Sequence, residues 1–582
     1  MKNTVLLLFF FALMGCSDAP RETLKDHLLE DWRSLDREVT DLRKLVQSDT
    51  DPKKVVQAFS QSRLAYKNVE WALEYFQPET GRFVNGPALD EIEFEENRVF
   101  PPAGFQVIEE LLAENDPKIK SEILREIDIL RSNLEQARRH FEAISISDAQ
   151  ALDALRQQTY RIITLGITGF DSPIMFTSIA EAAVSLKSIG QTLEHFKTPV
   201  PEKLRREISN AVLFCNRTDF NTFDRAQFIV RFANPISASL AEFQQVARLE
   251  TVTRQRVVRN QSPTLFDRQA FDADAFVPSN EYKTNPQKVA LGEKLFYDPQ
   301  LSGDGSRSCA TCHQPEKAFT DGLRTNSALN GHSLTRNTPS LSYAAFQNAQ
   351  FWDLRQLDLE KQSVDVIRNT DEMHGDFVQI TKKLSANPTY SKGFKKAFPK
   401  SGQIEDWHVQ NAIAAYIRTL GKFNSRFDAF MRGDLKALSN QEVEGMNLFM
   451  GKAKCATCHF TPLFNGTVPP IYAKTEQEVL GTPQDHTNRA QSNDAGRYEQ
   501  NQLPQLRGAF KTPTVRNVAK TAPYMHNGAF RTLAEVVDFY DSGGGVGLGF
   551  KLENQTLPPD RLNLTANEKQ ALIAFMESLS DQ

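Results

Sequence analysis

The chain has 582 residues, of which 40% are hydrophobic and 24% are charged, a composition that fits a globular protein and excludes a collagen-like or disordered chain. Its formal net charge is −5, so it has no basic surplus to neutralise phosphates, and no nucleic-acid partner is expected. Six cysteines are too few to form a disulfide scaffold in a chain of this length.

The N-terminus carries the pattern of an export signal. Lys2 precedes an apolar run over residues 5–14, which is too short to cross a bilayer and fits the core of a signal peptide. Gly15 and Cys16 then resemble a bacterial lipobox, in which the cysteine is lipidated. We therefore expect residues 1–16 to be a lipoprotein-type signal peptide, with Cys16 as the only membrane anchor and the protein in the periplasm. A plain secretory signal with a chance cysteine is the alternative.

Residues 24–248 have the apolar periodicity of amphipathic helices. Leu28, Trp32 and Leu35 begin a series in which apolar residues recur three and four positions apart, and no alternating strand pattern competes with it. We expect this part to be an antiparallel helical bundle. Residues 249–284, where proline, arginine and small polar residues accumulate, are expected to link the bundle to the second half.

One segment of the predicted bundle differs from its surroundings. Gly104-Phe105-Gln106-Val107-Ile108-Glu109 is similar to the GxHxxE signature of imelysin-like periplasmic bundles. Gln106 stands in the place of the histidine, so a metal role is not carried over to this chain. The alternative interpretation is a helix start whose Glu109 faces solvent.

Two Cys-x-x-Cys-His motifs lie in the second half. They are Cys309-Ala310-Thr311-Cys312-His313 and Cys455-Ala456-Thr457-Cys458-His459. In such a motif the two thiols add to the vinyl groups of one porphyrin, and the adjacent histidine binds the iron as its proximal ligand. We therefore expect two covalently bound c-type haems. A single four-cysteine zinc site is the alternative, but it does not require the adjacent histidines.

The sequence before each motif repeats as well. Residues 291–296 (Leu-Gly-Glu-Lys-Leu-Phe) precede the first motif, and residues 445–449 (Gly-Met-Asn-Leu-Phe) precede the second. Each segment has the character of a helix that leads the chain to its cysteines. The predicted fold class is therefore all-α, with the bundle followed by two cytochrome c-like haem domains over residues 285–423 and 424–582.

Several further motifs complete the pattern of the second half. They are Leu295-Phe296-Tyr297-Asp298, Phe319-Thr320-Asp321-Gly322, Arg336-Asn337-Thr338-Pro339-Ser340-Leu341, Phe351-Trp352-Asp353, Glu372-Met373, Thr512-Pro513-Thr514-Val515-Arg516-Asn517 and Ala522-Pro523-Tyr524-Met525-His526-Asn527-Gly528. With these motifs, residues 285–580 resemble the bacterial di-haem cytochrome c peroxidases and the MauG-like enzymes related to them. The resemblance implies an oxidoreductase that reacts with hydrogen peroxide and passes electrons between two haems.

The resemblance also implies roles for individual residues. His313 becomes the proximal ligand of the peroxide-reacting (peroxidatic) haem, and Glu372 and Gln362 line its distal side. A carboxylate in that place can shuttle a proton from one peroxide oxygen to the other. His459 becomes the proximal ligand of the second haem, and Trp352 becomes an electron relay between the haems. A solvated loop carboxylate at Glu372 and a plain aromatic core residue at Trp352 are the alternatives.

The resemblance implies a calcium ion between the haems and leaves two histidines to be placed. Asn337, Thr521 and Pro523 would supply the hard oxygen donors that calcium prefers. His332 lies between the first motif and Arg336-Asn337, and His374 directly follows Glu372-Met373; either could approach the first haem.

Tyr540 is the main departure from the peroxidases. In those enzymes a methionine binds the second haem fourteen residues after the histidine of a Tyr-Phe-His-Gly-like motif, and the same count from His526 ends at Tyr540. MauG-like proteins have a tyrosine as this ligand. Methionine sulfur raises the haem potential, whereas a hard, anionic phenolate stabilises oxidised iron. A buried core tyrosine is the alternative.

Three functions remain open at the level of the sequence. The first is peroxide removal with a small electron-transfer protein as donor, and the second is MauG-like oxidation of a side chain on a partner protein. Tyr540 favours the second. The third is a non-catalytic electron carrier or binding module, which would not require the distal carboxylate of Glu372.

Overall fold

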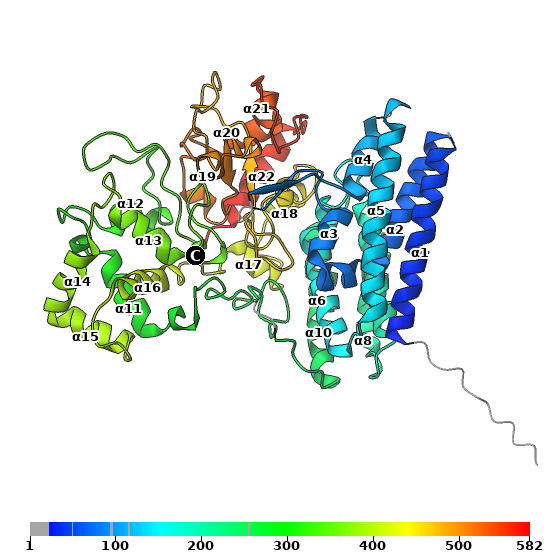
Figure 1. Ribbon diagram of the computed structural model, residues 1–582, viewed down its shortest axis with the longest axis horizontal. Helices are drawn as coiled ribbons and strands as arrows, with labels where there is room; N and C mark the ends of the chain where they lie inside the picture. Colours follow the sequence, from blue (N-terminus) through cyan, green and yellow to red (C-terminus); the bar gives the residue numbers. More distant parts are fainter. Residues whose placement is uncertain (1–22, 49–50, 94–96, 115–116, 254–255) are drawn as a thin grey trace, which may run out of the picture.

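The computed structural model describes residues 23–48, 51–93, 97–114, 117–253 and 256–582. The predicted signal peptide and Cys16 lie outside the described residues. Within the described part of the chain, no helix combines the length and the apolar character needed to cross a membrane. Figure 1 shows a helical bundle that lies beside a C-terminal half with two further groups of helices.

The N-terminal bundle consists of long helices packed along one another (Figure 1). The predicted apolar face of α1 (Leu24–Gln47) is buried, including Leu28, Trp32 and Leu35. Helix α1 packs against α2 (Pro52–Phe76) and α5 (Lys120–Ala143). The other helices of this part are α3 (Pro78–Asn85), α4 (Phe105–Glu114), α6 (Asp148–Thr164), α7 (Ser178–Leu193), α8 (Glu202–Cys215), α9 (Arg225–Phe228) and α10 (Asn234–Val246).

The C-terminal half contains two groups of shorter helices joined by long loops. The first group comprises α11 (Pro286–Phe296), α12 (Cys309–Cys312), α13 (Leu359–Arg368), α14 (Phe377–Ala386), α15 (Pro388–Ala397) and α16 (Asp406–Ile417). The second comprises α17 (Arg426–Met431), α18 (Asn440–Phe449), α19 (Tyr498–Asn501), α20 (Leu533–Asp541), α21 (Gly544–Gly547) and α22 (Ala566–Ser578).

The predicted fold class, all-α, is confirmed. Strands in the described ranges are limited to two short antiparallel pairs. One pair joins β1 (Glu91–Glu93) to β2 (Arg98–Phe100), and the other joins β3 (Gln477–Val479) to β4 (Ala509–Lys511). Every other regular element of the described chain is helical.

The two C-terminal groups are built on the same close helix contact. A Cβ atom placed on Gly292 of α11 would lie 1.8 Å from the carbonyl oxygen of Ala412 in α16. A Cβ atom placed on Gly445 of α18 would lie 1.9 Å from the carbonyl oxygen of Ala571 in α22. Only glycine allows the backbones to approach this closely. The repeat seen in the sequence is therefore also a repeat of helix packing.

Substitution of Gly445 by alanine is expected to destabilise the second group. The added methyl group would force α18 away from α22, and overpacking of this kind costs about 1–3 kcal/mol. Thermal unfolding of the haem-loaded protein measures the effect. Gly402→Ala is the matched control, because no atom lies within 4 Å of a Cβ at that position. Equal melting temperatures for the two variants would contradict the close contact.

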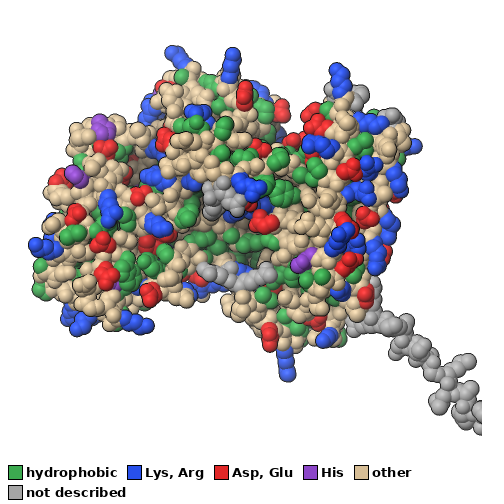
Figure 2. Space-filling view, in the orientation of Figure 1, with side chains coloured by type: hydrophobic (Ala, Val, Ile, Leu, Met, Phe, Trp, Pro, Cys, Tyr) green, Lys and Arg blue, Asp and Glu red, His purple; other side chains and the backbone are tan. Residues whose placement is uncertain are grey.

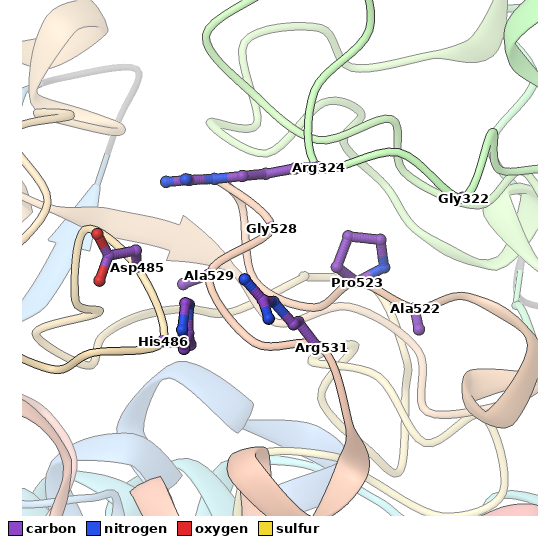
Figure 3. A pocket seen from close by; sticks show the side chains of 9 residues that line it. All are labelled: Gly322, Arg324, Asp485, His486, Ala522, Pro523, Gly528, Ala529 and Arg531. Carbon is purple, nitrogen blue, oxygen red and sulfur yellow. The ribbon is translucent and has the colours of Figure 1, made fainter.

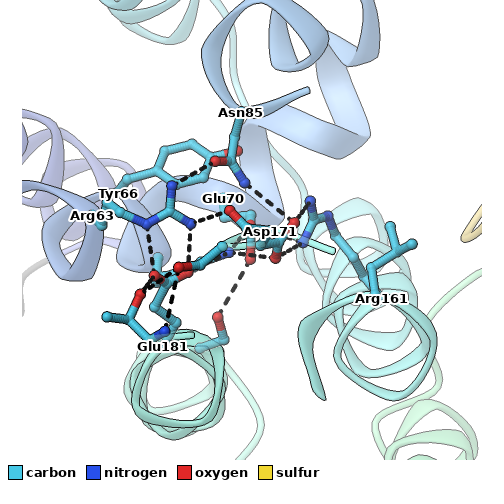
Figure 4. Close-up of polar contacts among 12 residues, drawn as sticks. Arg63, Tyr66, Glu70, Asn85, Arg161, Asp171 and Glu181 are labelled. Atoms are coloured by element: carbon cyan, nitrogen blue, oxygen red, sulfur yellow. Dashed lines mark hydrogen bonds and ion pairs between the residues drawn. The ribbon is translucent and has the colours of Figure 1, made fainter. Parts of the chain in front are cut away.

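A network of buried charges lies in the interior of the bundle (Figure 4). Arg63 Nε lies 2.7 Å from Glu181 Oε1, although α2 and α7 are far apart in the sequence. Lys67 Nζ lies 2.7 Å from Asp171 Oδ2, and Arg161 Nη1 lies at the same distance from that atom. Burial opposes ionisation of Asp171, but the charges of Arg161 and Lys67 hold its pKa well below the ordinary value.

Asp171→Asn is expected to destabilise the protein by about 3–5 kcal/mol, because it removes one of the two buried carboxylates, Asp171 and Glu70, that Lys67 and Arg161 share. The folded-state pKa of Asp171 is lowered. The contribution of the Asp171 carboxylate to the free energy of unfolding is therefore present above the unfolded-state pKa. It is lost as the pH falls through the acid range. Unfolding measured at neutral and acid pH should show the variant and the parent converging in acid. Asp128→Asn, which removes an exposed partner of Arg43, should cost less than about 1 kcal/mol.

The segment that resembles the imelysin signature is buried in the bundle. Gly104 has a φ of +96°, a conformation that favours glycine. Gln106 Nε2 donates to the carbonyl oxygen of Asn85 at 2.9 Å. Glu109 is fully buried and accepts hydrogen bonds from Ser172 Oγ and the backbone N–H of Met175. The interpretation of Glu109 as a solvent-facing residue is therefore wrong.

The bundle and the C-terminal half meet at a contact surface, called the seam below, which contains both polar and aromatic contacts. The Asn447 amide of α18 accepts from the backbone N–H of Ala226 at 3.0 Å and donates to Asp224 Oδ1 at 3.1 Å. The rings of Phe170 and Phe460 pack edge-on. Figure 2 shows that the molecule is hollowed on one face between the bundle and the C-terminal half, where hydrophobic side chains gather.

The segment between the two halves packs into this seam. Leu265, Phe266 and Phe271 are buried, and the guanidinium group of Arg156 donates to the carbonyl oxygens of Asn260 and Ser262. This segment therefore packs against the bundle as well as connecting it to the C-terminal half.

Candidate functional site

The first Cys-x-x-Cys-His motif forms one short helix that presents its histidine ring. The backbone N–H of His313 donates to the carbonyl oxygen of Cys309 at 2.9 Å. His313 Nδ1 lies 2.9 Å from the carbonyl oxygen of Phe319, which can only accept, so Nδ1 carries the proton. The lone pair of Nε2 is then available to a metal. Burial lowers the pKa of His313, which keeps the ring neutral.

The second motif repeats this arrangement. The backbone N–H of His459 donates to the carbonyl oxygen of Cys455 at 2.9 Å. His459 Nδ1 donates to the carbonyl oxygen of Pro513 at 3.0 Å, and burial lowers the pKa of the ring to about 4. Both histidines therefore satisfy the chemistry of a neutral, oriented haem ligand.

The four motif cysteines are free thiols in the structure. Burial raises the pKa of Cys309 and of Cys455 to about 12, and that of Cys312 to about 11. Each pair lies beside a histidine whose Nε2 is available, which is the donor set that a c-type haem requires. The residues of both motifs therefore fit a covalently attached haem.

Tyr540 lies next to the second motif. Burial raises the pKa of its phenol, and the neighbouring thiols of Cys458 and Cys455 raise it further, which places the side chain beside both cysteines. No hydrogen bond to its hydroxyl is found within the described part of the chain. The side chain projects from the end of α20, an element separate from the one that carries His459.

Glu372 lies next to the first motif. Burial raises the pKa of its carboxyl, while a hydrogen bond from Asn369 Nδ2 to Glu372 Oε1, at 2.7 Å, opposes the rise. The carboxylate in turn raises the pKa of Cys312, so the two side chains are neighbours. Gln362 is half-buried on α13, the helix that ends directly before Asn369.

The two histidines that could approach the first haem flank the loop of Glu372. His332 Nε2 lies 3.7 Å from Asp371 Oδ2, and its side chain is about half exposed. His374 is exposed and has a φ of +47°. Both rings lie toward solvent in this structure.

Trp352 joins the two C-terminal groups. Its indole N–H donates to the carbonyl oxygen of Asn337 at 2.9 Å. The backbone N–H of Asn337 donates to the carbonyl oxygen of His526, and that of Lys511 donates to the carbonyl oxygen of Trp352. Trp352 is therefore held by hydrogen bonds from both C-terminal groups.

The three residues expected to bind calcium are partly engaged with protein atoms. The Asn337 carbonyl accepts from Trp352, and Thr521 Oγ1 donates to the carbonyl oxygen of Val518 at 3.1 Å. Pro523 lines a cavity of about 410 Å³ between the two C-terminal groups, beside Arg324 and Arg531 (Figure 3). No cluster of three or more acidic, histidine or cysteine side chains occurs among the described residues.

Two features near the second motif were not predicted. Glu478 on β3 lies beside Cys458, and its carboxyl accepts from the hydroxyl of Thr556. Lys454, directly before Cys455, donates to the carbonyl oxygen of Pro173 at 3.3 Å, and its Nζ lies 5.1 Å from the ring centre of Phe176. Neither residue belongs to a sequence motif, and their positions depend on contacts with distant segments.

Comparison with known proteins gives the same result for the C-terminal half. Residues 286–436 match the family model described as di-haem cytochrome c peroxidase. The chain is 38% identical to the cytochrome-c peroxidase IdrP1 of Pseudomonas sp. strain SCT, over 51% of this chain and 83% of that protein. It is 35% identical to the methylamine utilization protein MauG of Methylorubrum extorquens, over 50% of this chain and 78% of that protein.

One further relative and one solved structure are also similar to this chain. The cytochrome c551 peroxidase of Pseudomonas aeruginosa is 33% identical, over 50% of this chain and 79% of that protein. Among solved structures, a MauG-like protein associated with microbial copper homeostasis is 30% identical, with a TM-score of 0.46, over 53% of this chain and 94% of that one. The family model ends at residue 436 and does not include the bundle.

Proposed function

The chain belongs to the di-haem cytochrome c peroxidase family and is a peroxidase-type oxidoreductase, and from this premise we propose that Glu372 moves the proton in its reduction of hydrogen peroxide. The observation that carries the proposal is the position of this carboxyl group, half-buried beside Cys312 with a raised pKa. A carboxyl group whose pKa is raised holds its proton more readily than an ordinary glutamate and can accept and return one during the reaction.

Seven residues would hold the two haems. Cys309, Cys312 and His313 would bind the first, and Cys455, Cys458, His459 and Tyr540 would bind the second. When bound, the haems supply iron that reacts with peroxide and carries electrons. The hydrogen bonds from His313 Nδ1 to Phe319 and from His459 Nδ1 to Pro513 orient the two imidazoles and direct each Nε2 toward its haem.

Each polar residue near the first motif has its own role in proton transfer. Glu372 takes the proton from the nearer peroxide oxygen and returns it to the farther one, so that water leaves. Asn369 Nδ2 holds Glu372 Oε1 in place. Gln362 orients the peroxide from α13, and Trp352, held through Asn337, relays electrons between the two domains.

The nature of the side chain at position 540 bears on which of two oxidation reactions the enzyme carries out. An anionic phenolate on the second iron disfavours electron entry from a high-potential donor and favours sharing of an oxidising equivalent. Oxidation of a side chain on a partner protein is thus the second candidate function, beside peroxide removal with a small electron-transfer protein.

The proposed function is tested with the purified, exported protein. A pyridine haemochrome assay should give two covalently attached haems per chain. Peroxide should then be consumed in the presence of a reduced small c-type cytochrome or an artificial electron donor. A protein that carries both haems and leaves peroxide untouched would be a carrier.

The finer proposals on location and calcium have separate tests. Residues 1–16 as a lipoprotein signal predict that the protein takes up radiolabelled palmitate and fractionates with membranes, and that Cys16→Ser abolishes both. A calcium ion held by Asn337, Thr521 and Pro523 predicts that chelation slows electron transfer between the haems and that added calcium restores it. Normal transfer in fully chelated protein would remove calcium from the proposal.

A further inference from the structure

Tyrosines lead from the second haem motif into the bundle. Tyr472 is fully buried, and its hydroxyl donates at 2.8 Å to the carbonyl oxygen of Thr461, two residues beyond His459. Pro470 and Ile471, the two residues directly before Tyr472, line the same cavity as Tyr160 of α6, which brings Tyr472 and Tyr160 close to each other across the seam.

Tyr160 and Tyr75 line one cavity at this seam. The cavity measures about 160 Å³, and an apolar cavity of about 150 Å³ is enough to take a benzene ring. The Tyr160 side chain is 4% exposed, and its hydroxyl has no hydrogen-bond partner within the described part of the chain. Apolar walls come from both halves of the molecule: Phe76, Pro78, Val258, Pro470 and Ile471.

Tyr75 has a proton acceptor in place. Its hydroxyl donates to Asp153 Oδ2 at 2.6 Å, and Asp153 is paired with Arg256, whose Nη1 lies 2.7 Å from Oδ1. A phenol that loses an electron becomes a strong acid, so a hydrogen-bonded carboxylate makes the oxidation easier by taking the proton. Tyr75 is 3% exposed, which protects a phenoxyl radical from solvent.

We propose that Tyr160 and Tyr75 form a second oxidation site, at which a single-ring phenol bound in the seam cavity is oxidised by one electron. The inference rests on the proposed function, because hydrogen peroxide supplies the oxidising equivalents. Tyr75 gives an electron toward Tyr160 and Tyr472, and its proton moves to Asp153. The bound phenol then returns one electron to Tyr75, Asp153 returns the proton, and the phenol releases its own proton. Two such events convert one hydrogen peroxide and two phenols into two waters and two phenoxyl radicals.

The cavity explains why a phenol is the expected substrate. Its volume fits one aromatic ring. The hydroxyl of Tyr160 is buried and unpaired within the described residues, so Tyr160 meets the cavity mainly with its ring, against which a phenol ring can pack. Arg156 and Arg259 also line the cavity, and their positive charge favours a partly negative phenolic oxygen there.

Electron paramagnetic resonance of the haem-loaded protein tests the proposal. After one equivalent of hydrogen peroxide and rapid freezing, the parent protein should show a tyrosyl radical, and added 4-methylphenol should shorten its lifetime. Tyr75→Phe and Tyr160→Phe should lose the radical signal. Tyr66→Phe is the matched control, since Tyr66 is equally buried in the bundle but its hydroxyl donates to Glu74 and it does not line the cavity.

Optical spectra recorded on the same samples separate this inference from the proposed function. If peroxide changes the haem spectrum but the radical signal is the same in Tyr75→Phe, Tyr160→Phe and Tyr66→Phe, the second oxidation site is disproved and the proposed function stands. If peroxide leaves the haem spectrum unchanged, both fail. Circular dichroism confirms that each variant is folded, and spin-trap adducts mapped by mass spectrometry to Tyr75 or Tyr160 would support the site independently.

Discussion

Glu372→Gln is expected to lower the rate of peroxide reduction by about 10²–10⁴-fold, the usual contribution of a positioned general acid–base. Glutamine keeps the size of the side chain and can still pair with Asn369, but it cannot take a proton from peroxide. The haem content should not change. Stopped-flow mixing with peroxide measures the rate, and Glu316→Gln, at an exposed position close to the same motif, is the matched control.

The pH profile provides a second readout of the same variant. Because burial raises the pKa of Glu372, its basic form is lost as the pH falls through a value above that of an ordinary glutamate. The parent enzyme should therefore lose activity on the acid side at a higher pH than a solvated carboxyl would predict. A profile that keeps this acid limb in Glu372→Gln would assign the proton transfer to another group.

Tyr540→Met is expected to raise the reduction potential of the second haem. Axial ligands set haem potentials over a range of about 0.8 V, and a change from phenolate to thioether is among the larger steps within it. Electron entry from a reduced cytochrome should become faster, while any long-lived oxidised state formed with peroxide should become shorter. Spectroelectrochemical titration measures the potential.

A control variant separates ligation from packing. Tyr498→Phe removes a hydroxyl from the same C-terminal group, at a distance from both motifs in the sequence, and should leave the potential unchanged. If Tyr540→Met behaved like Tyr498→Phe, Tyr540 would be a core residue and the choice between the two functions would lose its main support.

The haem motifs could be predicted from the sequence because their chemistry is local. Two cysteines and a histidine within five residues must sit on one turn of helix, and the structure places each set so. The repeat of the segments that contain Gly292 and Gly445 was visible in the sequence, but their close contacts with Ala412 and Ala571 come only from the structure.

The features that could not be predicted from the sequence all depend on contacts between residues that are far apart in the chain. Arg63 meets Glu181 because α2 and α7 pack together, and a helix that carries charges on its buried face is normally predicted to expose them. The position of Glu109 was misjudged for the same reason. Glu478 reaches Cys458 only because β3 pairs with β4, and a three-residue strand leaves almost no periodic signal.

The contact of Lys454 with the bundle has a consequence for biogenesis. This lysine lies directly before Cys455 and is tied to Pro173 and Phe176, so the finished molecule closes over the second attachment motif from the bundle side. A maturation enzyme that joins porphyrin to cysteine needs an accessible, extended substrate. Attachment of a porphyrin to that motif is therefore expected to precede docking of the N-terminal bundle, so that the bundle is the last part to assemble although it is the first to be synthesised.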